Sequence, residues 1–136
     1  MVSCTLYLQV GDKYFPDEGW IDFASELLPP WSDGIASILE HGHGSTKCLF
    51  MEGPFSFVAA VHNANELEIT LIEELRKGLE TSAHIILAGD IVHELLSAAE
   101  LLSRTIEDQK WTTLKRDELR RAIERLRSLK RFPTLQ

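Results

Sequence analysis

Three strand-like apolar runs follow one another in residues 46–75, TKCLFMEGPFSFVAAVHNANELEITLIEEL, and two turn signals separate them. A strand places alternate side chains on the same face. In the third run the apolar positions are therefore predicted to face the core, while the acidic positions between them face solvent. The predicted core positions are Leu67, Ile69 and Leu71. The pattern is typical of a half-buried antiparallel strand.

The second run, residues 55–61, is apolar at nearly every position, as in a strand at the centre of a sheet. Gly53-Pro54 is predicted to form a tight hairpin loop before it, because glycine accepts a positive φ and proline fixes the next φ. This loop would place Phe50 opposite Phe57. Both faces of the sheet then carry apolar side chains. A second helix over the other face is favoured over an exposed contact patch, since large exposed apolar patches are uncommon.

Around this stretch the chain is predicted to form a single α+β domain over residues 1–136, with the order β-α-β-β-β-β-α-α and an antiparallel sheet of about five strands packed by helices. Residues 3–10 alternate like a strand, and residues 79–89 contain a β-branched run that predicts the last strand. Residues 11–20, with two glycines and a proline, are predicted to be a loop.

Helical spacing of apolar residues predicts a first amphipathic helix over residues 20–40. Pro29 and Pro30 remove amide donors and clash with the preceding turn, so the helix is predicted to break there into two pieces. The glycines of residues 41–44, HGHG, suit a helix C-cap and a turn.

Two further helices are predicted near the C-terminus. The first begins with Asp90 as its N-cap and runs to about Lys110. The second is capped by Thr112 or Thr113 and carries a narrow apolar row that ends near Leu129. Its many arginines are predicted to form a solvated face that leans on the rest of the protein, although a basic helix can also bind nucleic acid or an acidic membrane.

The charge of the chain is unevenly distributed. The net charge is −7, but residues 1–110 hold 18 acidic and 6 basic side chains, a balance of −12, and residues 111–136 hold 3 and 8, a balance of +5. An acidic body disfavours nucleic acid as a ligand and favours a basic partner. No apolar run is long enough for a membrane span and no signal-peptide pattern begins the chain, so we expect a cytoplasmic protein without a membrane partner.

Metal and cofactor chemistry is not predicted. Cys4 and Cys48 lack CxxC spacing and are interpreted as buried free thiols. His41 and His43 could bind a metal, but they lie in a predicted turn without a third ligand nearby in sequence, so a plain loop is favoured. The sequence therefore predicts no metal ligand and no cofactor.

Catalytic residues are not predicted either. His84, Asp90 and His93 lie near a strand-to-helix junction and could compose an acid–base site. No nucleophile or oxyanion motif accompanies them, so helix capping and ordinary surface histidines are favoured. We expect a protein that is not an enzyme.

Two sequence patterns suggest a family. Trp20-Ile21-Asp22-Phe23, followed by Trp31 and by residues 49–55, LFMEGPF, resembles small bacterial proteins that share a W-x-D-F helix and an F-M-[DE]-G-P-[FY] hairpin. Several such families resemble immunity proteins of bacterial toxin systems. The resemblance covers roughly the first half of the chain, and its motif residues are structural types. It would imply an unbroken helix before Trp31.

The leading hypothesis is therefore a non-enzymatic immunity protein that neutralises a cognate basic toxin by direct binding. One alternative is a small-molecule-binding or enzymatic domain with a pocket between helix 20–40 and the sheet. Another is a structural homo-oligomer, such as a homodimer, that uses the apolar second face of the sheet. The predicted partner-binding residues are Asp12, Asp17, Glu18, Glu66, Glu68, Glu73 and Glu74.

Overall fold

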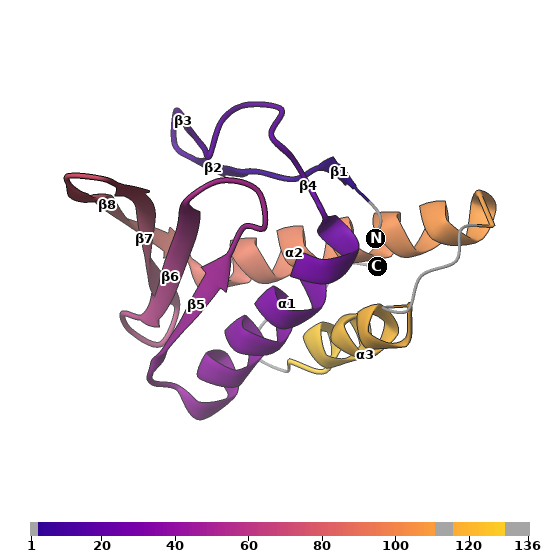
Figure 1. The fold of residues 1–136 in the computed structure, drawn as a ribbon. Coiled ribbons are helices and arrows are strands. Elements are labelled where there is room, and N and C mark those ends of the chain that lie inside the picture. Colours follow the sequence, from indigo (N-terminus) through magenta and orange to yellow (C-terminus); the bar gives the residue numbers. More distant parts are fainter. Residues whose placement is uncertain (1–2, 111–115, 130–136) are drawn as a thin grey trace.

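The computed structural model describes residues 3–110 and 116–129 of the chain and confirms the α+β class. Figure 1 shows a sheet on one side and three helices on the other. The elements are β1 (Cys4–Thr5), β2 (Leu8–Val10), β3 (Lys13–Phe15), β4 (Ile21–Asp22), α1 (Ala24–His41), β5 (Ser45–Leu49), β6 (Phe55–Val61), β7 (Glu66–Leu75), β8 (Gly78–Leu87), α2 (Ala88–Asp108) and α3 (Arg116–Arg127). None of the described helices is both long and apolar enough to cross a bilayer.

The main sheet is an antiparallel meander in the order β5-β6-β7-β8. The strand predicted at residues 55–61 is confirmed, and it lies in the interior of the sheet. The predicted hairpin register is wrong by two residues, because Cys48 rather than Phe50 lies opposite Phe57. The loop is longer than Gly53-Pro54: the Phe50 amide donates to the Phe55 carbonyl (3.2 Å), and residues 51–54 connect them. A shift of two residues leaves every side chain on its predicted face.

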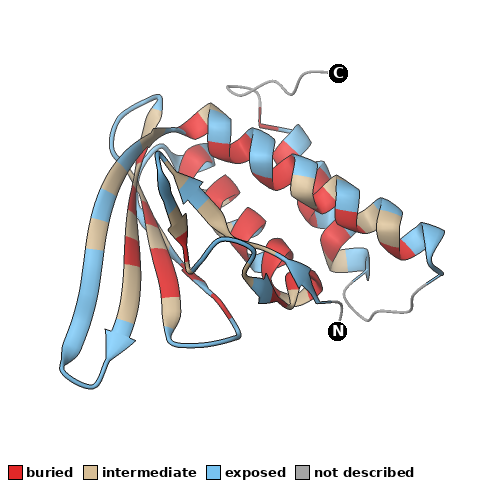
Figure 2. Ribbon diagram, turned by 90° about the horizontal axis from the view of Figure 1, so that it is seen from above, coloured by how far each residue is buried: buried red, intermediate tan, exposed pale blue. Residues whose placement is uncertain are grey.

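The two faces of the main sheet differ in what covers them. We call the side that packs against the helices the inner face and the other side the outer face. Phe57, Ile69 and Leu71 lie on the inner face and are buried, as the alternation predicted for β7. Figure 2 shows the helices on that side only. The predicted second helix over the other face is wrong for the described residues, because α1 and α2 pack on the inner face and α3 packs on those two helices.

Helix α1 is continuous, so the predicted break at Pro29-Pro30 is wrong. Apolar side chains on both sides of the prolines, among them Leu28 and Trp31, are buried against the sheet and the other helices, and this packing outweighs the missing amide donors. The helix begins at Ala24. The prediction that residues 20–23 are helical is therefore wrong. Its predicted end is confirmed, since Gly42 adopts φ 76° and its amide donates to the Ile38 carbonyl.

The N-terminal segment forms two small sheets instead of one strand followed by a loop. Strand β1 pairs with β4, and β2 pairs with β3, which lies inside the predicted loop. The segment folds back because Phe15 is buried against Phe50 and Phe55, with ring centroids 5.9 and 5.6 Å away. Cys4 lies at the start of this segment and is exposed, so its predicted burial is wrong. We call residues 3–22 the N-terminal ribbon.

The C-terminal elements largely follow the prediction. Strand β8 and helix α2 are present, but α2 begins at Ala88, so Asp90 is in the first turn and is not the N-cap. The Ala88 amide donates to the Asn65 carbonyl (2.8 Å), so a tertiary contact replaces the side-chain cap. The apolar row of α3 up to Leu129 is buried. The predicted cap at Thr112 or Thr113 lies outside the described residues.

The basic helix α3 leans on the acidic body, as predicted. Arg125 is 3.2 Å from a Glu40 carboxylate oxygen and 3.5 Å from one of Asp33, both on α1. Hydrogen bonding by Arg125 lowers the pKa of Glu40, more than partial burial raises it. This pairing places the arginine against α1 and away from a free basic surface.

Candidate interaction surface

The outer face of the main sheet carries four of the eight large apolar side chains that remain exposed among the described residues. Leu49 on β5 is 56% exposed, and three residues of β8 are comparably open: Leu79 (66%), Ile85 (45%) and Leu87 (55%). Alternation along β8 places these three on one face. A soluble monomer without a partner rarely leaves such a row of apolar side chains uncovered.

Acidic side chains of β7 lie beside this apolar row. The register pairs Glu66 with Leu87, and Glu68 with Ile85. Further along, Glu74 is paired with Leu79. Cross-strand partners lie within reach of each other's side chains. The outer face therefore presents three repeats of one carboxylate beside one exposed apolar group, and we call these six residues the acidic–apolar strip.

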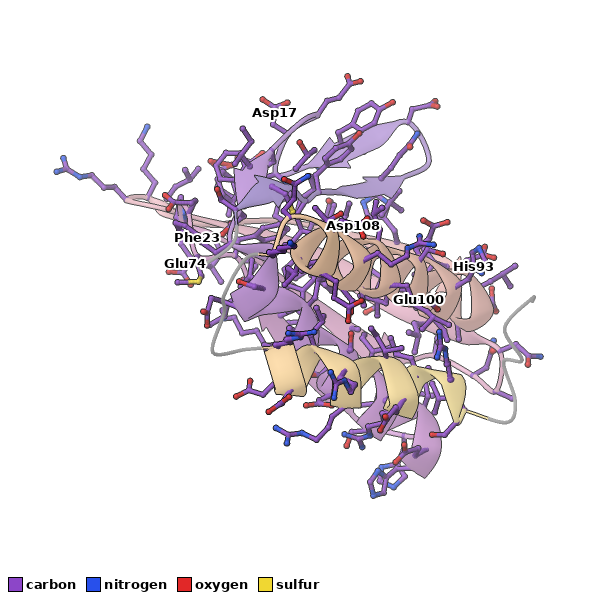
Figure 3. All side chains as sticks on the ribbon, turned by 90° about the vertical axis from the view of Figure 1, so that its right-hand side faces the viewer. Asp17, Phe23, Glu74, His93, Glu100 and Asp108 are labelled. Atoms are coloured by element: carbon purple, nitrogen blue, oxygen red, sulfur yellow. The ribbon has the colours of Figure 1, made fainter. Side chains whose placement is uncertain are left out.

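The structure separates the seven predicted partner-binding residues into three groups. Glu66, Glu68 and Glu74 share the outer face, whereas Glu73 alternates to the inner face. Asp12, Asp17 and Glu18 are exposed on the N-terminal ribbon. Figure 3 shows Asp17 on the ribbon and Glu74 on the sheet. The sequence did not reveal the apolar half of the strip, because its three residues belong to a β8 run whose face could not be assigned without the register.

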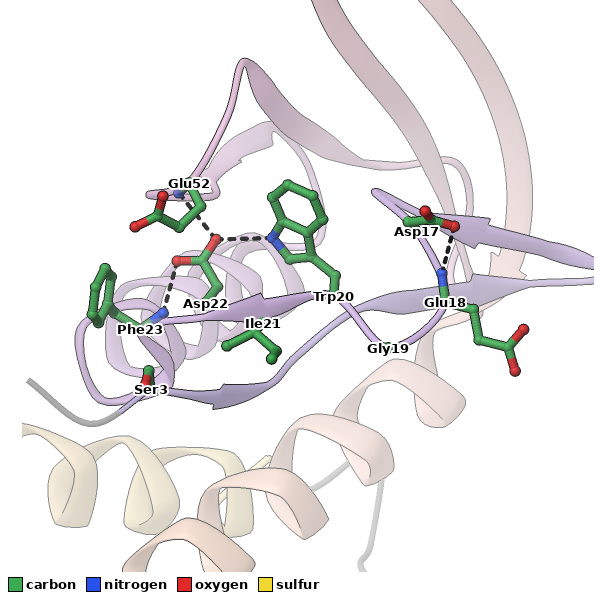
Figure 4. A pocket seen from close by; sticks show the side chains of 9 residues that line it. All are labelled: Ser3, Asp17, Glu18, Gly19, Trp20, Ile21, Asp22, Phe23 and Glu52. Carbon is green, nitrogen blue, oxygen red and sulfur yellow. Dashed lines mark hydrogen bonds between the residues drawn. The ribbon is translucent and has the colours of Figure 1, made fainter.

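A buried carboxylate joins the two motifs that carry the family resemblance. Asp22 is 1% exposed and accepts three hydrogen bonds: from Trp20 Nε1 (3.2 Å), from the Phe23 amide (2.7 Å) and from the Glu52 amide (3.2 Å). Figure 4 shows these bonds at the base of an open pocket of about 540 Å³. Trp20 also packs edge-to-face on Phe55. Because Asp22 belongs to the ribbon and accepts from the Glu52 amide, it holds the ribbon to the 51–54 loop. The sequence did not predict this role of Asp22, although all the residues involved belong to the W-x-D-F and E-G-P-F motifs.

A second depression lies between the N-terminal ribbon and the junction of β8 with α2. It has a volume of about 730 Å³. Its lining comes from residues 7–11 around β2, from residues 85–87 at the end of β8, from Ile69, and from the first turns of α2. We call it the β8 groove. Its size is within the range of roughly 300–1,000 Å³ that is usual for ligand sites.

The space between α1 and the sheet, where one alternative placed a pocket, is occupied by aromatic rings at its centre. Trp31 lies 4.9 Å from Phe50 and 5.1 Å from Phe57, centroid to centroid, with both pairs edge-to-face. The indole Nε1 of Trp31 donates to the Leu49 carbonyl (2.9 Å). Trp31 is therefore a core residue that ties α1 to the end of β5.

The candidate metal and acid–base residues are not assembled into sites within the described residues. No cluster of three or more histidine, cysteine or acidic side chains there could hold a metal. His84 contacts the Ser82 hydroxyl (3.1 Å), and no hydrogen bond links it to Asp90 or His93 in the described part of the chain. Cys48 is buried on the inner face, and burial raises the pKa of its thiol to about 12.

Comparisons with known proteins add no family. No family model, curated protein or solved structure matches the chain.

Proposed function

We propose that the protein is a non-enzymatic binding module that docks a basic protein partner on the outer face of its sheet, in the cytoplasm. The acidic–apolar strip is the observation that carries this proposal. Its apolar side chains provide area that water leaves on association, and its carboxylates attract a cationic surface before contact.

The charge distribution supports a basic partner. Three of the five arginines of α3 pair with acids of α1 or α2: Arg116 with Glu107, Arg125 with Glu40 and Arg127 with Glu100. The outer face keeps its three glutamates, and Lys47 is a cation on that face of β5. A partner with interleaved lysine or arginine and apolar residues is complementary to such a surface.

The most specific form of this proposal is an immunity protein that blocks a cognate toxin. Immunity genes accompany the genes of their toxins, so the product of a neighbouring gene is the partner to test. The resemblance of the Trp20–Phe23 and 49–55 motifs to immunity-like families points the same way. A homodimer through the outer face is less well supported, because the strips of two copies would bring like charges together.

Association kinetics test the proposal. The neighbouring gene's product is immobilised, and binding of the chain is followed at two salt concentrations. Glu68→Lys is expected to lower the association rate about tenfold at low salt, and the loss should shrink as salt shortens the Debye length to roughly 8 Å or less. Asp108→Lys makes the same charge change on α2, away from the strip, and serves as the matched control.

Two results would overturn the proposal. If Glu68→Lys and Asp108→Lys slow association equally, the attraction is a property of the whole acidic body and not of the strip. If the chain does not bind the neighbouring gene's product at all, the immunity function is wrong.

A further inference from the structure

The β8 groove runs along strand edges, and its lining residues show this. A cavity that lies over one face of a strand touches alternate residues. The β8 groove instead touches three consecutive residues, Ile85–Leu87, and five consecutive residues around β2, from Tyr7 to Gly11. It is therefore open to the backbone of both strands.

Both of these edges lack a strand partner within the described residues. Strand β8 pairs with β7 alone, and β2 pairs with β3 alone. The ladder of β8 with β7 continues without a bulge from Gly78 to Leu87, which leaves a regular row of backbone donors and acceptors on the free side. Natural proteins usually protect such an edge, and an uncovered one is a template for an added strand.

The chemistry of the groove specifies what kind of strand fits. Its floor is apolar, with Ile69 and Ile91 among the lining residues. At one end, Asp90 and Glu94 project from the same side of α2, since they are four residues apart. Tyr7 adds an aromatic ring to the lining. No lysine or arginine lines the groove, so these two carboxylates have no cation within it.

We propose that the β8 groove binds an extended segment of a protein partner that pairs with β8 as an added strand and places a lysine or arginine side chain between Asp90, Glu94 and Tyr7. This rests on the proposed function and names the part of the partner that the protein recognises. The groove is continuous with the acidic–apolar strip, because Ile85 and Leu87 belong to both.

A second copy of the chain fits this groove less well than a basic partner. The segment that a copy would add through its own edge is β8, residues 78–87, GLETSAHIIL, which contains no lysine or arginine. It brings the acidic Glu80 instead, so it offers no lysine or arginine to pair with Asp90 and Glu94 of α2.

Nuclear magnetic resonance titration of the whole chain tests the proposal without the natural partner. The probe is the peptide TVKVT with acetylated and amidated ends. It is expected to bind saturably and to shift the amides of residues 85–87 and of Tyr7–Gly11. The peptide TVEVT tests charge, and TVKVT with N-methylated backbone amides tests strand pairing. Each change is expected to weaken binding about tenfold or more, equivalent to about 1.4 kcal/mol.

Matched variants locate the cation site. The double variant Asp90→Asn/Glu94→Gln is expected to weaken TVKVT binding about tenfold. Figure 3 shows Asp108 at the opposite end of α2 from His93, so Glu107→Gln/Asp108→Asn removes the same charge from the same helix outside the groove. That control is expected to bind TVKVT normally. Glu94→Gln alone, at an exposed position, keeps the test valid if the double variant folds poorly.

The outcomes separate this proposal from the proposed function. Equal binding of TVKVT and TVEVT, shifts confined to other residues, or no saturable binding would each overturn the groove proposal. A neighbouring gene's product that binds the chain but leaves the amides on the free edge of β8 unprotected from hydrogen exchange would overturn the groove proposal and leave the proposed function intact. Peptide binding without partner binding would do the reverse.

Discussion

The inner and outer faces of the main sheet are built from the same strands, because successive side chains along each strand point to opposite faces. Leu71 on the inner face is buried beneath the helices, whereas Leu79, three residue pairs further along the ladder and on the outer face, is mostly exposed. Both are leucines in regular, paired strands. Apolar character therefore shows that a side chain favours contact, but the layer above it decides whether that contact is made within the chain.

Cysteine reactivity gives the largest expected contrast between the faces. In a Cys4→Ser background, Leu49→Cys would place a thiol on the outer face directly after Cys48 on the inner face. Burial raises the pKa of Cys48 to about 12. At pH 8 its thiolate fraction is therefore lower than that of an ordinary thiol by a factor of about a thousand or more. A disulfide reagent at pH 8 should label position 49 at least that much faster, and both positions equally in denaturant. Equal native rates would contradict the assignment of the two faces.

Leucine truncation compares the faces by stability. Leu71→Ala is expected to lower the free energy of unfolding by about 2–5 kcal/mol, because it leaves a cavity in the core. Leu79→Ala makes the same chemical change on the outer face and should alter stability by less than about 0.5 kcal/mol. Urea unfolding of both variants checks this. A large loss for Leu79→Ala would mean that the outer face is covered after all.

Asp22 holds the N-terminal ribbon, which covers part of the inner face, to the 51–54 loop. Asp22→Asn is expected to lower the free energy of unfolding by about 1–3 kcal/mol, because the amide group turns a donor toward N–H groups that need an acceptor. Asp12→Asn, at an exposed turn, is the control and should be neutral. Thermal unfolding followed by circular dichroism measures both, and an unaltered melting temperature for Asp22→Asn would remove this role.

The smallest expected effect concerns the partly exposed ion pair of Arg125 on α3 with Glu40 on α1. Arg125 lowers the pKa of Glu40 in the folded protein, so the pair stabilises the fold fully above the ordinary glutamate pKa of roughly 4.3 and loses this contribution as pH falls through the lowered value. Glu40→Gln should reduce stability slightly at pH 7, by less than about 1 kcal/mol because both side chains are partly exposed. Urea unfolding at pH 7 and pH 3 should show the difference closing at low pH.

Several elements of the fold could be predicted from local pattern. The strict alternation in residues 66–71 identified β7 and its buried face, and the apolar density of residues 55–61 identified an interior strand. Gly42 could be assigned as a cap because the left-handed φ that it adopts suits glycine. These features depend on neighbours in sequence, so the sequence contains the required information.

The remaining features depend on contacts between distant residues. The double proline predicted a broken helix, but burial on both sides of it keeps α1 continuous. The N-terminal ribbon folds back because Phe15 finds Phe50 and Phe55. For the candidate site, the glutamates of β7 could be named from sequence, whereas the apolar partners on β8 and the groove required the register and the position of α2. Neither follows from spacing along one segment.

The order of elements along the chain has a consequence for synthesis on the ribosome. Strands β5 to β8 each pair with the strand next in sequence, so their contacts close short loops and form readily once the segment has emerged. Helix α1 is translated before all of them, and the face that holds Trp31 and Ile35 has no sheet to cover it until then. At about 5–20 residues per second, translation from His41 to Leu87 takes roughly 2–9 s. During that interval the nascent chain displays an apolar helix, which is the state that chaperones at the exit tunnel would meet.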